Sequence, residues 1–463
     1  MANLKVLTPI DFAQSFAQFI CAAPTSYHAA AWEAAELRKA GFIEQDEHEK
    51  WIGSTRGFVQ RSGAVIAWQL PSKIGPNTGF RIVGSHNDSP SFKIKPNPDT
   101  AAFGFSQVNV EIYGGPLLNS WLNRDLGIAG QISTIDGETH LVQTPPIMFI
   151  PQLAPHLDRT QNTDLKLSLQ VDYHPVWALG EQSVFEYLAA SAGVAANRIA
   201  GMDLYAYDAE QPRIFGGVSG ADFFAAGRQD NLSSVFAALN AFQEAAALTA
   251  GAAAEIADSH DEHEANAHEA NEYDGDVLIF AAFDHEEVGS STFTGAEGPL
   301  LEHILRRICT SLISRRSSAN AQFSSDSAEA FLQMLANSSC ISADAAHSIN
   351  PNKAEKHDPA HHPVLGGGAI LKINSQQRYA TEAQGIALWL RACESSAAPT
   401  QEFVSNNDVP CGSTIGPATA ARLGIVTVDV GIPLLSMHSV REISAPADLL
   451  GLAKTLKEYY AGA

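Results

Sequence analysis

The stretch VLIFAAFDHEEVGSS at residues 277–291 constrains the fold of this chain more than any other. Residues 277–283 form an unbroken apolar run of strand length, and Asp284, Glu286 and Glu287 follow it. An uninterrupted apolar run predicts a strand buried on both faces, as in an α/β sheet covered by helices. Ligands of open α/β sheets bind at the carboxyl ends of the strands, where these carboxylates stand.

The adjacent residues Glu286 and Glu287 are expected to have two different roles. Neighbouring side chains of an extended chain point to opposite sides. We therefore expect one glutamate to bind a metal ion while the other faces a metal-bound water. On this stretch alone, a solvated acidic junction between strand and loop is the competing interpretation.

Composition narrows the class of protein. The 463 residues carry a formal charge of −22, which disfavours nucleic acid and anionic membranes as partners. No apolar run approaches the ~20 residues that span a membrane, and Asp11 interrupts any signal peptide. The five cysteines are scattered without a CxxC pair, which is typical of reduced thiols in a cytoplasmic protein.

Hydrophobic periodicity predicts helices alternating with strands around a large core. Thr8 is expected to cap a first helix that begins at Pro9. Further helices are expected at residues 29–39, 232–242, 300–313, 326–336, 379–395 and 447–460, and strands at 64–70, 80–85, 277–283, 340–343 and 425–430.

The character of the chain changes between residues 95 and 220. Prolines and glycines there separate short β-like runs at residues 108–113, 130–135 and 165–171. We therefore predict a core domain in two parts, 1–94 and 221–463, with an inserted β-rich domain at 95–220. Residues 245–276 are rich in Ala, Glu and His, which predicts a flexible low-complexity insertion rather than a histidine metal site.

Five acidic or imidazole groups stand at equivalent places, directly after expected strands or at the start of a helix: His86, Asp230, Glu287, Asp344 and His438. Zinc favours imidazole and carboxylate ligands. Two histidines and three carboxylates can hold two Zn²⁺ ions if one carboxylate bridges, and such pairs are a standard hydrolytic device. Each residue alone has an ordinary explanation, such as a helix cap at Asp230, so the hypothesis rests on the five together.

Asp88 stands two residues beyond His86. Its carboxylate is expected to accept the second ring N–H of His86 and so fix the ring's tautomer and orientation. An Asx turn before Ser89 and Pro90 is the alternative interpretation.

Longer motifs support a specific resemblance. VGSHNDSPSFKIKP, GRQDNLSSVFAAL, DHEEVGSSTFTGA and NDVPCGSTIGPATAARLGIVTVDVGIPLLSMHSVRE occur in this order. With them, nearly the whole chain closely resembles the aspartyl aminopeptidase family of dinuclear-zinc aminopeptidases. The resemblance implies an α/β fold, with a zinc-peptidase-like α/β/α sandwich core and an inserted β-rich dimerisation domain.

The resemblance also implies a role for each candidate residue. His86 and Asp344 match ligands of one zinc, Glu287 and His438 match ligands of the other, and Asp230 matches the bridging carboxylate. Glu286 matches the general base that takes a proton from the water between the metals, and Asp88 matches the residue that orients His86. Mn²⁺ or Co²⁺ are alternatives to the two Zn²⁺ ions.

Substrate and assembly follow from the same resemblance. The family prefers peptides with N-terminal Asp or Glu, and Lys372 matches its clamp for the acidic side chain. An anion beside carboxylate ligands needs such a cation. The family forms a homo-oligomer, a dodecamer built from dimers, in which a histidine of a neighbouring subunit completes the site. His156 is the matching position.

The sequence departs from the family at Asn350, where a second histidine usually follows His347. That histidine is thought to hydrogen-bond the reacting carbonyl, which an asparagine amide can do less strongly. Such a donor is typically worth ~3 kcal/mol, so lower kcat and lost activity both stay open. Two further alternatives are a deacylase of N-acyl amino acids on the same core and a non-catalytic assembly protein.

Overall fold

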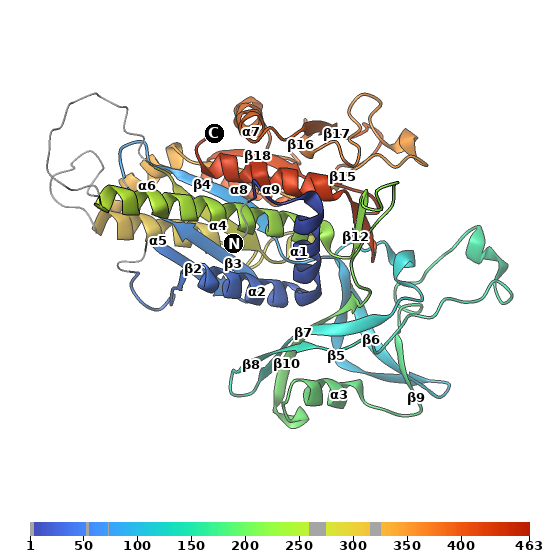
Figure 1. Cartoon of the computed structure of the whole chain (residues 1–463). Helices are drawn as coiled ribbons and strands as arrows, with labels where there is room; N and C mark the ends of the chain where they lie inside the picture. The colour runs from blue at the N-terminus through green and yellow to red at the C-terminus, as the bar shows by residue number, and fades with distance from the viewer. Residues whose placement is uncertain (1–3, 52–54, 73, 259–274, 315–325) are drawn as a thin grey trace, which may run out of the picture.

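A computed structural model describes residues 4–51, 55–72, 74–258, 275–314 and 326–463. Figure 1 shows a layered α/β core and a β-rich part set beside it, joined near the start of the helix labelled α4. No helix in these described ranges is both long enough and apolar enough to cross a bilayer.

The core contains a mixed nine-stranded sheet with the order β1-β2-β3-β13-β4-β14-β18-β16-β17. Its central strands β13, β4, β14 and β18 are parallel neighbours. Their carboxyl ends therefore meet at one edge, where ligands of such sheets bind. The strands are β1 (Ile43–Glu44), β2 (Arg56–Arg61), β3 (Ala64–Gln69), β4 (Phe80–His86), β13 (Val277–Phe283), β14 (Ser339–Ala343), β16 (Ala369–Ile373), β17 (Thr400–Val404) and β18 (Val426–Gly431).

Helices cover both faces of this sheet, which gives the expected α/β/α sandwich (Figure 1). On one face lie α1 (Pro9–Ala22), α2 (Ser26–Lys39), α4 (Gln229–Asp258), α7 (Ala383–Ser396) and α9 (Pro446–Tyr460). On the other lie α5 (Leu300–Ser314), α6 (Ser327–Ala336) and α8 (Ile415–Leu423). Within β13, Leu278 and Phe280 face the first layer and Val277 and Ile279 face the second, so the strand is buried on both sides as predicted.

The predicted start of α1 is confirmed. The Thr8 hydroxyl accepts the Asp11 N–H at 3.2 Å, the Asp11 carboxylate accepts the Thr8 N–H at 3.4 Å, and Pro9 is the first helical residue. This reciprocal capping satisfies backbone donors that an uncapped helix end leaves unpaired.

The β-rich part is a six-stranded antiparallel sheet with the order β8-β7-β10-β5-β6-β9 and its own apolar core. It consists of β5 (Ser91–Ala102), β6 (Phe105–Tyr113), β7 (Leu126–Thr134), β8 (Thr139–Gln143), β9 (Val176–Leu179) and β10 (Ile199–Asp208), with α3 (Val184–Ser191) beside it. The chain returns to the core through β11 (Arg213–Phe215) and β12 (Phe223–Ala226), which pairs with β20 (Glu442–Ser444). The sheet starts four residues before the domain boundary that the sequence predicts, and that division stays a prediction.

Two expectations about single elements were wrong, namely the strand at residues 165–171 and the start of α7. Residues 165–171 form no strand, because Leu165 and Leu167 pack directly onto the core of the inserted sheet. Helix α4 continues to Asp258, so residues 245–258 are helical, whereas His260, His263 and His268 lie outside the described residues, and the flexible insertion stays a prediction. Helix α7 begins at Ala383 rather than at residue 379.

Candidate active site

One edge of the central sheet gathers the predicted ligands. His86 ends β4, Asp344 follows β14, and Glu286 and Glu287 follow β13, so neighbouring parallel strands deliver all four. Asp230 arrives at the start of α4, and His438 arrives on the loop between β19 (Pro433–Leu434) and β20. All of them line one cavity of about 530 Å³.

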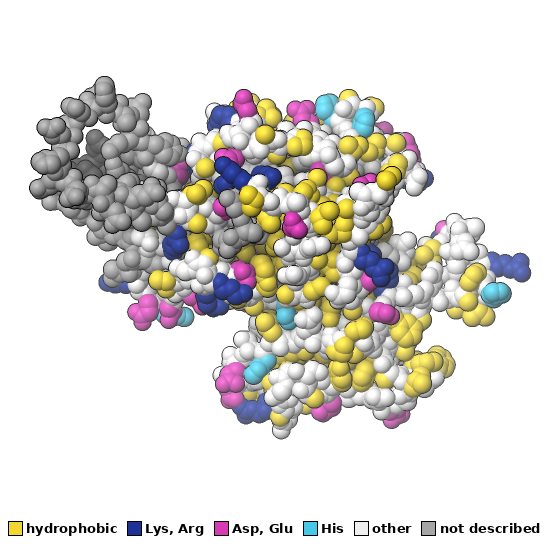
Figure 2. Space-filling model, in the orientation of Figure 1, with side chains coloured by type: hydrophobic (Ala, Val, Ile, Leu, Met, Phe, Trp, Pro, Cys, Tyr) yellow, Lys and Arg dark blue, Asp and Glu magenta, His cyan; other side chains and the backbone are white. Residues whose placement is uncertain are grey.

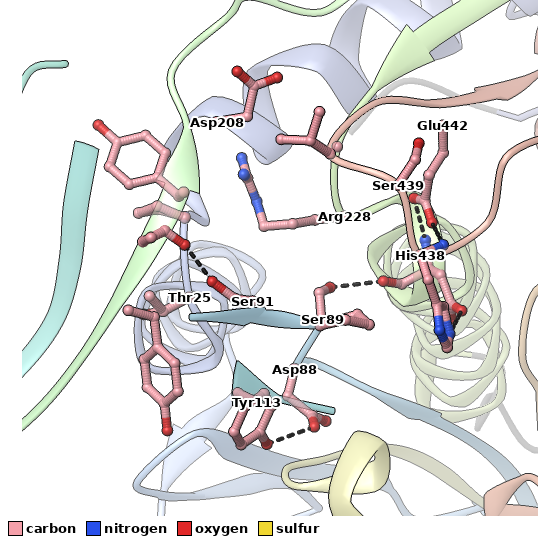
Figure 3. Close-up of a pocket in the computed structure, with 18 of the residues that line it drawn as sticks. Thr25, Asp88, Ser89, Ser91, Tyr113, Asp208, Arg228, His438, Ser439 and Glu442 are labelled. Carbon is pink, nitrogen blue, oxygen red and sulfur yellow. Dashed lines mark hydrogen bonds and ion pairs between the residues drawn. The ribbon is translucent and has the colours of Figure 1, made fainter. Parts of the chain in front are cut away.

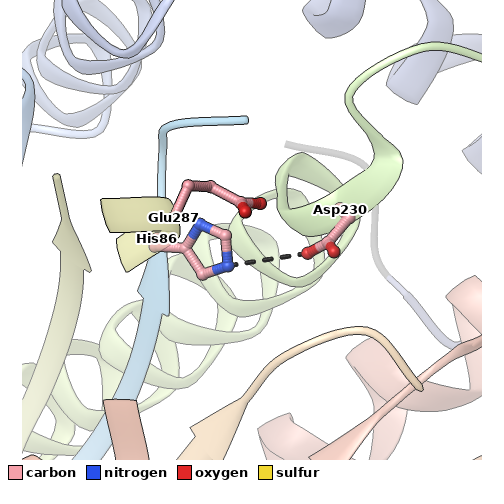
Figure 4. Close-up of side chains that lie close together, drawn as sticks. All are labelled: His86, Asp230 and Glu287. Carbon is pink, nitrogen blue, oxygen red and sulfur yellow. Dashed lines mark ion pairs between the residues drawn. The ribbon is translucent and has the colours of Figure 1, made fainter. Parts of the chain in front are cut away.

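Asp230 lies between the two histidines. Its Oδ1 is 3.5 Å from His86 Nε2, and its Oδ2 is 3.2 Å from His438 Nε2. Each oxygen of one buried carboxylate thus faces a different imidazole. Figure 4 shows the His86 ring directed at Asp230, with Glu287 beside them. This is the arrangement that a carboxylate bridging two cations requires.

Two further carboxylates complete two groups around Asp230. Asp344 Oδ1 lies 3.5 Å from His86 Nε2, and Glu287 Oε2 lies 3.7 Å from His438 Nε2. Ligand atoms of His86, Asp230 and Glu287 all lie within 4.8 Å of one another. The structure therefore brings together all five residues that the sequence predicts as ligands.

The chemistry of these side chains fits bound cations. Asp230 Oδ1 and Glu287 Oε1 are buried and have no hydrogen-bond partner among the described residues. A buried acceptor without a partner is costly, and a cation would satisfy both oxygens. Imidazole nitrogen and carboxylate oxygen are donors that Zn²⁺ favours.

The electrostatics of the two histidines point the same way. Burial alone lowers the pKa of His438, but its contact with Asp230 and the charge of Glu287 raise that pKa to about 10. Burial likewise lowers the pKa of His86, but its contacts with Asp230, Asp344 and Asp88 raise that pKa well above the ordinary value. The carboxylates therefore hold positive charge at both imidazoles, and a metal ion would replace those protons.

Glu286 lies beside the ligands rather than among them. Its Oε2 is 3.9 Å from His86 Nε2, and its side chain lines the cavity. Burial raises its pKa to about 7, with the charges of Asp344, Asp230 and Asp88 adding to the effect and His86 opposing it. A carboxylate with a pKa near neutrality suits proton transfer.

The backbone after β13 differs from the extended chain that the sequence suggested. His285 adopts a left-handed conformation with φ 63°, and Glu286–Val288 form a 3₁₀ turn, η4. The turn, rather than the alternation of an extended strand, directs Glu287 toward His438 and Glu286 toward His86.

Asp88 holds this turn. The N–H groups of Glu286 and Glu287 donate to Asp88 Oδ1 at 3.0 Å and Oδ2 at 3.1 Å. The Tyr113 hydroxyl also donates to Oδ2, at 2.8 Å. His86 Nδ1 contacts the backbone carbonyl of Asp88 at 3.1 Å and its Oδ1 at 3.4 Å. Asp88 therefore holds the two glutamates, which the sequence did not indicate, and its orientation of His86 through the carboxylate stays a prediction.

Several residues that support the site escaped the sequence analysis. The His438 Nδ1–H donates to the Gly115 carbonyl at 2.9 Å, which leaves Nε2 facing Asp230. Tyr113 and Gly115 come from the β-rich part of the chain. No local pattern links them to residues so distant in sequence.

Lys372 reaches the cavity from β16. Its Nζ lies 3.2 Å from Asp344 Oδ2 and 5.3 Å from the centre of the Tyr379 ring. Its side chain is only 2% exposed, yet it lines the cavity. A buried cation thus faces the space beside the ligands, as the clamp hypothesis requires.

The remaining candidates lie elsewhere. Asn350 is exposed, its Oδ1 accepts the Asn352 N–H at 3.0 Å, and it is not among the described residues that line the cavity. His347, which the sequence left as a core or supporting residue, does line the cavity. This placement does not support Asn350 as the donor to a reacting carbonyl. His156 is exposed on a loop after residue 150, outside the cavity lining of its own chain.

Comparison with known sequences identifies relatives over nearly the full length. Residues 19–460 match the family described as aminopeptidase I zinc metalloprotease (M18). The chain is 46% identical over 451 residues to a probable M18 family aminopeptidase 2 of Streptomyces avermitilis, covering 96% of each chain. It is 36% identical to the protein of that name in Pseudomonas aeruginosa, covering 97% of each.

Solved structures agree with this result. The chain is 28% identical in sequence to prApe1, whose crystal structure superposes with a TM-score of 0.84. The match covers 98% of this chain and 94% of the prApe1 chain. The chain is also 27% identical to the mApe1 dodecamer of S. cerevisiae, with a TM-score of 0.77, and the match covers 98% of this chain and 97% of the mApe1 chain.

Proposed function

The chain belongs to the M18 family of zinc aminopeptidases, and from this premise we propose that it removes an acidic first residue from peptides at a centre of two Zn²⁺ ions. The observation that carries this proposal is the position of Asp230, whose two oxygens face His86 and His438 at 3.5 and 3.2 Å.

In this proposal His86 and Asp344 would hold one ion, His438 and Glu287 would hold the other, and Asp230 would contribute to both. When bound, the zinc ions polarise the peptide carbonyl and lower the pKa of the attacking water. His347 also lines this cavity, and in this proposal its ring meets the substrate.

Glu286 is the proposed general base. It lines the cavity and stands next to the ligands without belonging to either group. Its carboxylate takes the proton of the attacking water and then passes it to the nitrogen of the leaving amine. Asp88 supports this role because it holds the backbone of Glu286.

Lys372 is the proposed selector for acidic substrates. A substrate carboxylate that enters a cavity lined by Glu286, Glu287 and Asp344 meets like charges. The buried Lys372 ammonium group lines this cavity and can form a charge-assisted hydrogen bond with that carboxylate. This supports peptides with N-terminal Asp or Glu as the preferred substrates.

We also propose a homo-oligomer built through the β-rich part. Large hydrophobic side chains are exposed there, including Phe103, Phe105, Leu141 and Leu179, and Figure 2 shows hydrophobic surface gathered over this part of the molecule. Exposed apolar groups of this kind mark interaction surfaces. The mApe1 relative is a dodecamer, and in such an assembly His156 would serve a neighbouring site. All five cysteines are free, which supports a cytoplasmic location.

A substrate panel tests this proposal. The full-length protein, loaded in turn with Zn²⁺, Mn²⁺ or Co²⁺, is assayed on peptides that begin with Asp, Glu, Ala or Leu and on the N-acetylated Asp peptide. We expect kcat/KM to be highest for Asp and Glu and the acetylated peptide to be inert. Preferential cleavage of the acetylated peptide would indicate a deacylase instead, and equal cleavage of all free peptides would remove the acidic preference.

A further inference from the structure

Glu442 connects two residues of the site without reaching the cavity itself. Its Oε1 accepts the His438 N–H at 2.8 Å, and its Oε2 accepts the Asp230 N–H at 3.1 Å. Figure 3 shows Glu442 beside His438. The side chain is 1% exposed and is not among the described residues that line the active-site cavity. The two oxygens of one buried carboxylate thus accept hydrogen bonds from the backbones of two proposed ligand residues that are far apart in the sequence.

The position of Glu442 is itself fixed. Strand β20 pairs with β12, where Glu442 stands opposite Ala226. The Gln229 side chain donates to the Glu442 carbonyl at 2.7 Å and accepts the Ser444 hydroxyl at 2.6 Å. The carboxylate therefore acts from a rigid support rather than from a mobile loop.

We propose that Glu442 is a positioning residue that sets the separation and orientation of Asp230 and His438, and so determines the affinity of the second cation site. This inference rests on the proposed function, in which Asp230 and His438 are ligands. The Gly115 carbonyl orients the His438 ring through Nδ1, whereas Glu442 holds the backbone from which the ring extends. Partners of this kind typically change metal affinity about 10- to 100-fold when mutated.

Substitution of Glu442 should weaken the two proposed cation sites unequally. Glu442 holds two of the three proposed ligands of the second ion, namely His438 and Asp230, and only one ligand of the first ion, Asp230. In E442Q the side-chain amide has one acceptor oxygen, and its NH₂ group turns toward one of the two backbone N–H donors. We therefore expect the second site to weaken more than the first.

Asp448 provides a matched control. It is also 1% exposed, and its two oxygens accept the Gly368 N–H at 2.8 Å and the Gly366 N–H at 2.7 Å. Neither glycine lines the cavity. D448N therefore repeats the loss of one acceptor on a buried carboxylate without touching a proposed ligand.

The test titrates the apo forms of wild type, E442Q and D448N with Co²⁺, monitored by visible absorption, and with Zn²⁺ in competition with a chromogenic chelator. We expect two ions per wild-type chain, a second-site affinity about 10- to 100-fold weaker in E442Q, an altered cobalt spectrum for that site, and wild-type values in D448N. If E442Q does not fold, E442D serves as the second test variant. Its side chain keeps the charge but is one methylene too short to reach both N–H donors, so the same weakening of the second site is expected.

Wild-type affinities in E442Q or E442D would overturn the inference, as would equal losses at both sites or an equal loss in D448N. A wild-type chain that binds no second ion would overturn the two-ion centre as well, so the two failures are distinguishable.

Discussion

Asp88 Oδ1 accepts the backbone N–H of Glu286 at 3.0 Å, and this bond joins the end of β4 to the turn after β13. The same carboxylate accepts the N–H of Glu287 at 3.1 Å. The proposed general base and a proposed ligand thus take their positions from one buried residue in the loop that follows β4.

Replacing Asp88 with Asn should disturb both glutamates at once. The amide presents one acceptor oxygen and one NH₂ group to two backbone N–H donors, so the turn must shift. We expect D88N to fold and to lower kcat about 10- to 100-fold. Steady-state kinetics with parallel thermal melts would measure this, and Y113F, which removes only the hydroxyl donor to Oδ2, should have a smaller effect. A D88N enzyme with wild-type kcat would refute this role.

Glu286→Gln should separate proton transfer from metal binding. The glutamine keeps the shape of the side chain but cannot accept a proton at neutral pH, and general-base catalysis is typically worth about 10²–10⁴-fold. We expect kcat to fall by at least about 100-fold while two zinc ions per chain remain by elemental analysis. Retained turnover would exclude Glu286 as the base, and lost zinc would make it a ligand.

Much of this site could be predicted because its residues follow buried strands. The apolar run before Asp284 predicts β13, and parallel neighbours must end at the same edge. His86 and Asp344 are therefore close to Glu287 whatever the loops do. The start of α1 was equally predictable, because Thr8, Pro9 and Asp11 determine it within four residues.

The rest depends on contacts that no local pattern encodes. The turn that separates Glu286 from Glu287 is held by Asp88, in the loop after β4, and by a left-handed residue at His285. In sequence, Glu442 resembles any charged residue of a surface loop, and only the pairing of β20 with β12 buries it. The hydrophobic run at 165–171 resembled a strand because packing on a sheet and pairing within one select the same residues.

Lys372→Met should change substrate choice more than turnover in general. A hydrogen bond to a charged group is worth about 1.5–3 kcal/mol, so we expect kcat/KM for an Asp peptide to fall about 10- to 100-fold relative to an Ala peptide. Because Lys372 also contacts Asp344 at 3.2 Å, zinc content must be measured alongside, with K372R as the charge-retaining control. An equal loss on both peptides would mean that Lys372 acts only through Asp344.

Acid should destabilise the fold in part through His28, which is buried and contacts the Thr25 hydroxyl at 2.8 Å through Nδ1. Burial, and then the charge of Arg228, lower the pKa of His28 from 6.5 to about 4. Between these two values the unfolded chain binds the proton and the folded chain does not, so the free energy of unfolding falls as the pH falls. Relative to the value above pH 6.5, the free energy of unfolding is expected to be about 2–3 kcal/mol lower at pH 4.5 because of His28.

H28Q removes this titration, so its unfolding free energy should fall less steeply than that of wild type between pH 7 and 4.5. Urea unfolding of both proteins across this range would measure the difference. Parallel curves would show that His28 titrates alike in the folded and unfolded chains. The stability that comes from keeping His28 neutral is fully present above pH 6.5 and is lost as the pH approaches 4. Acidification therefore acts on α2, the helix that carries His28, as well as on any metal that the cavity holds.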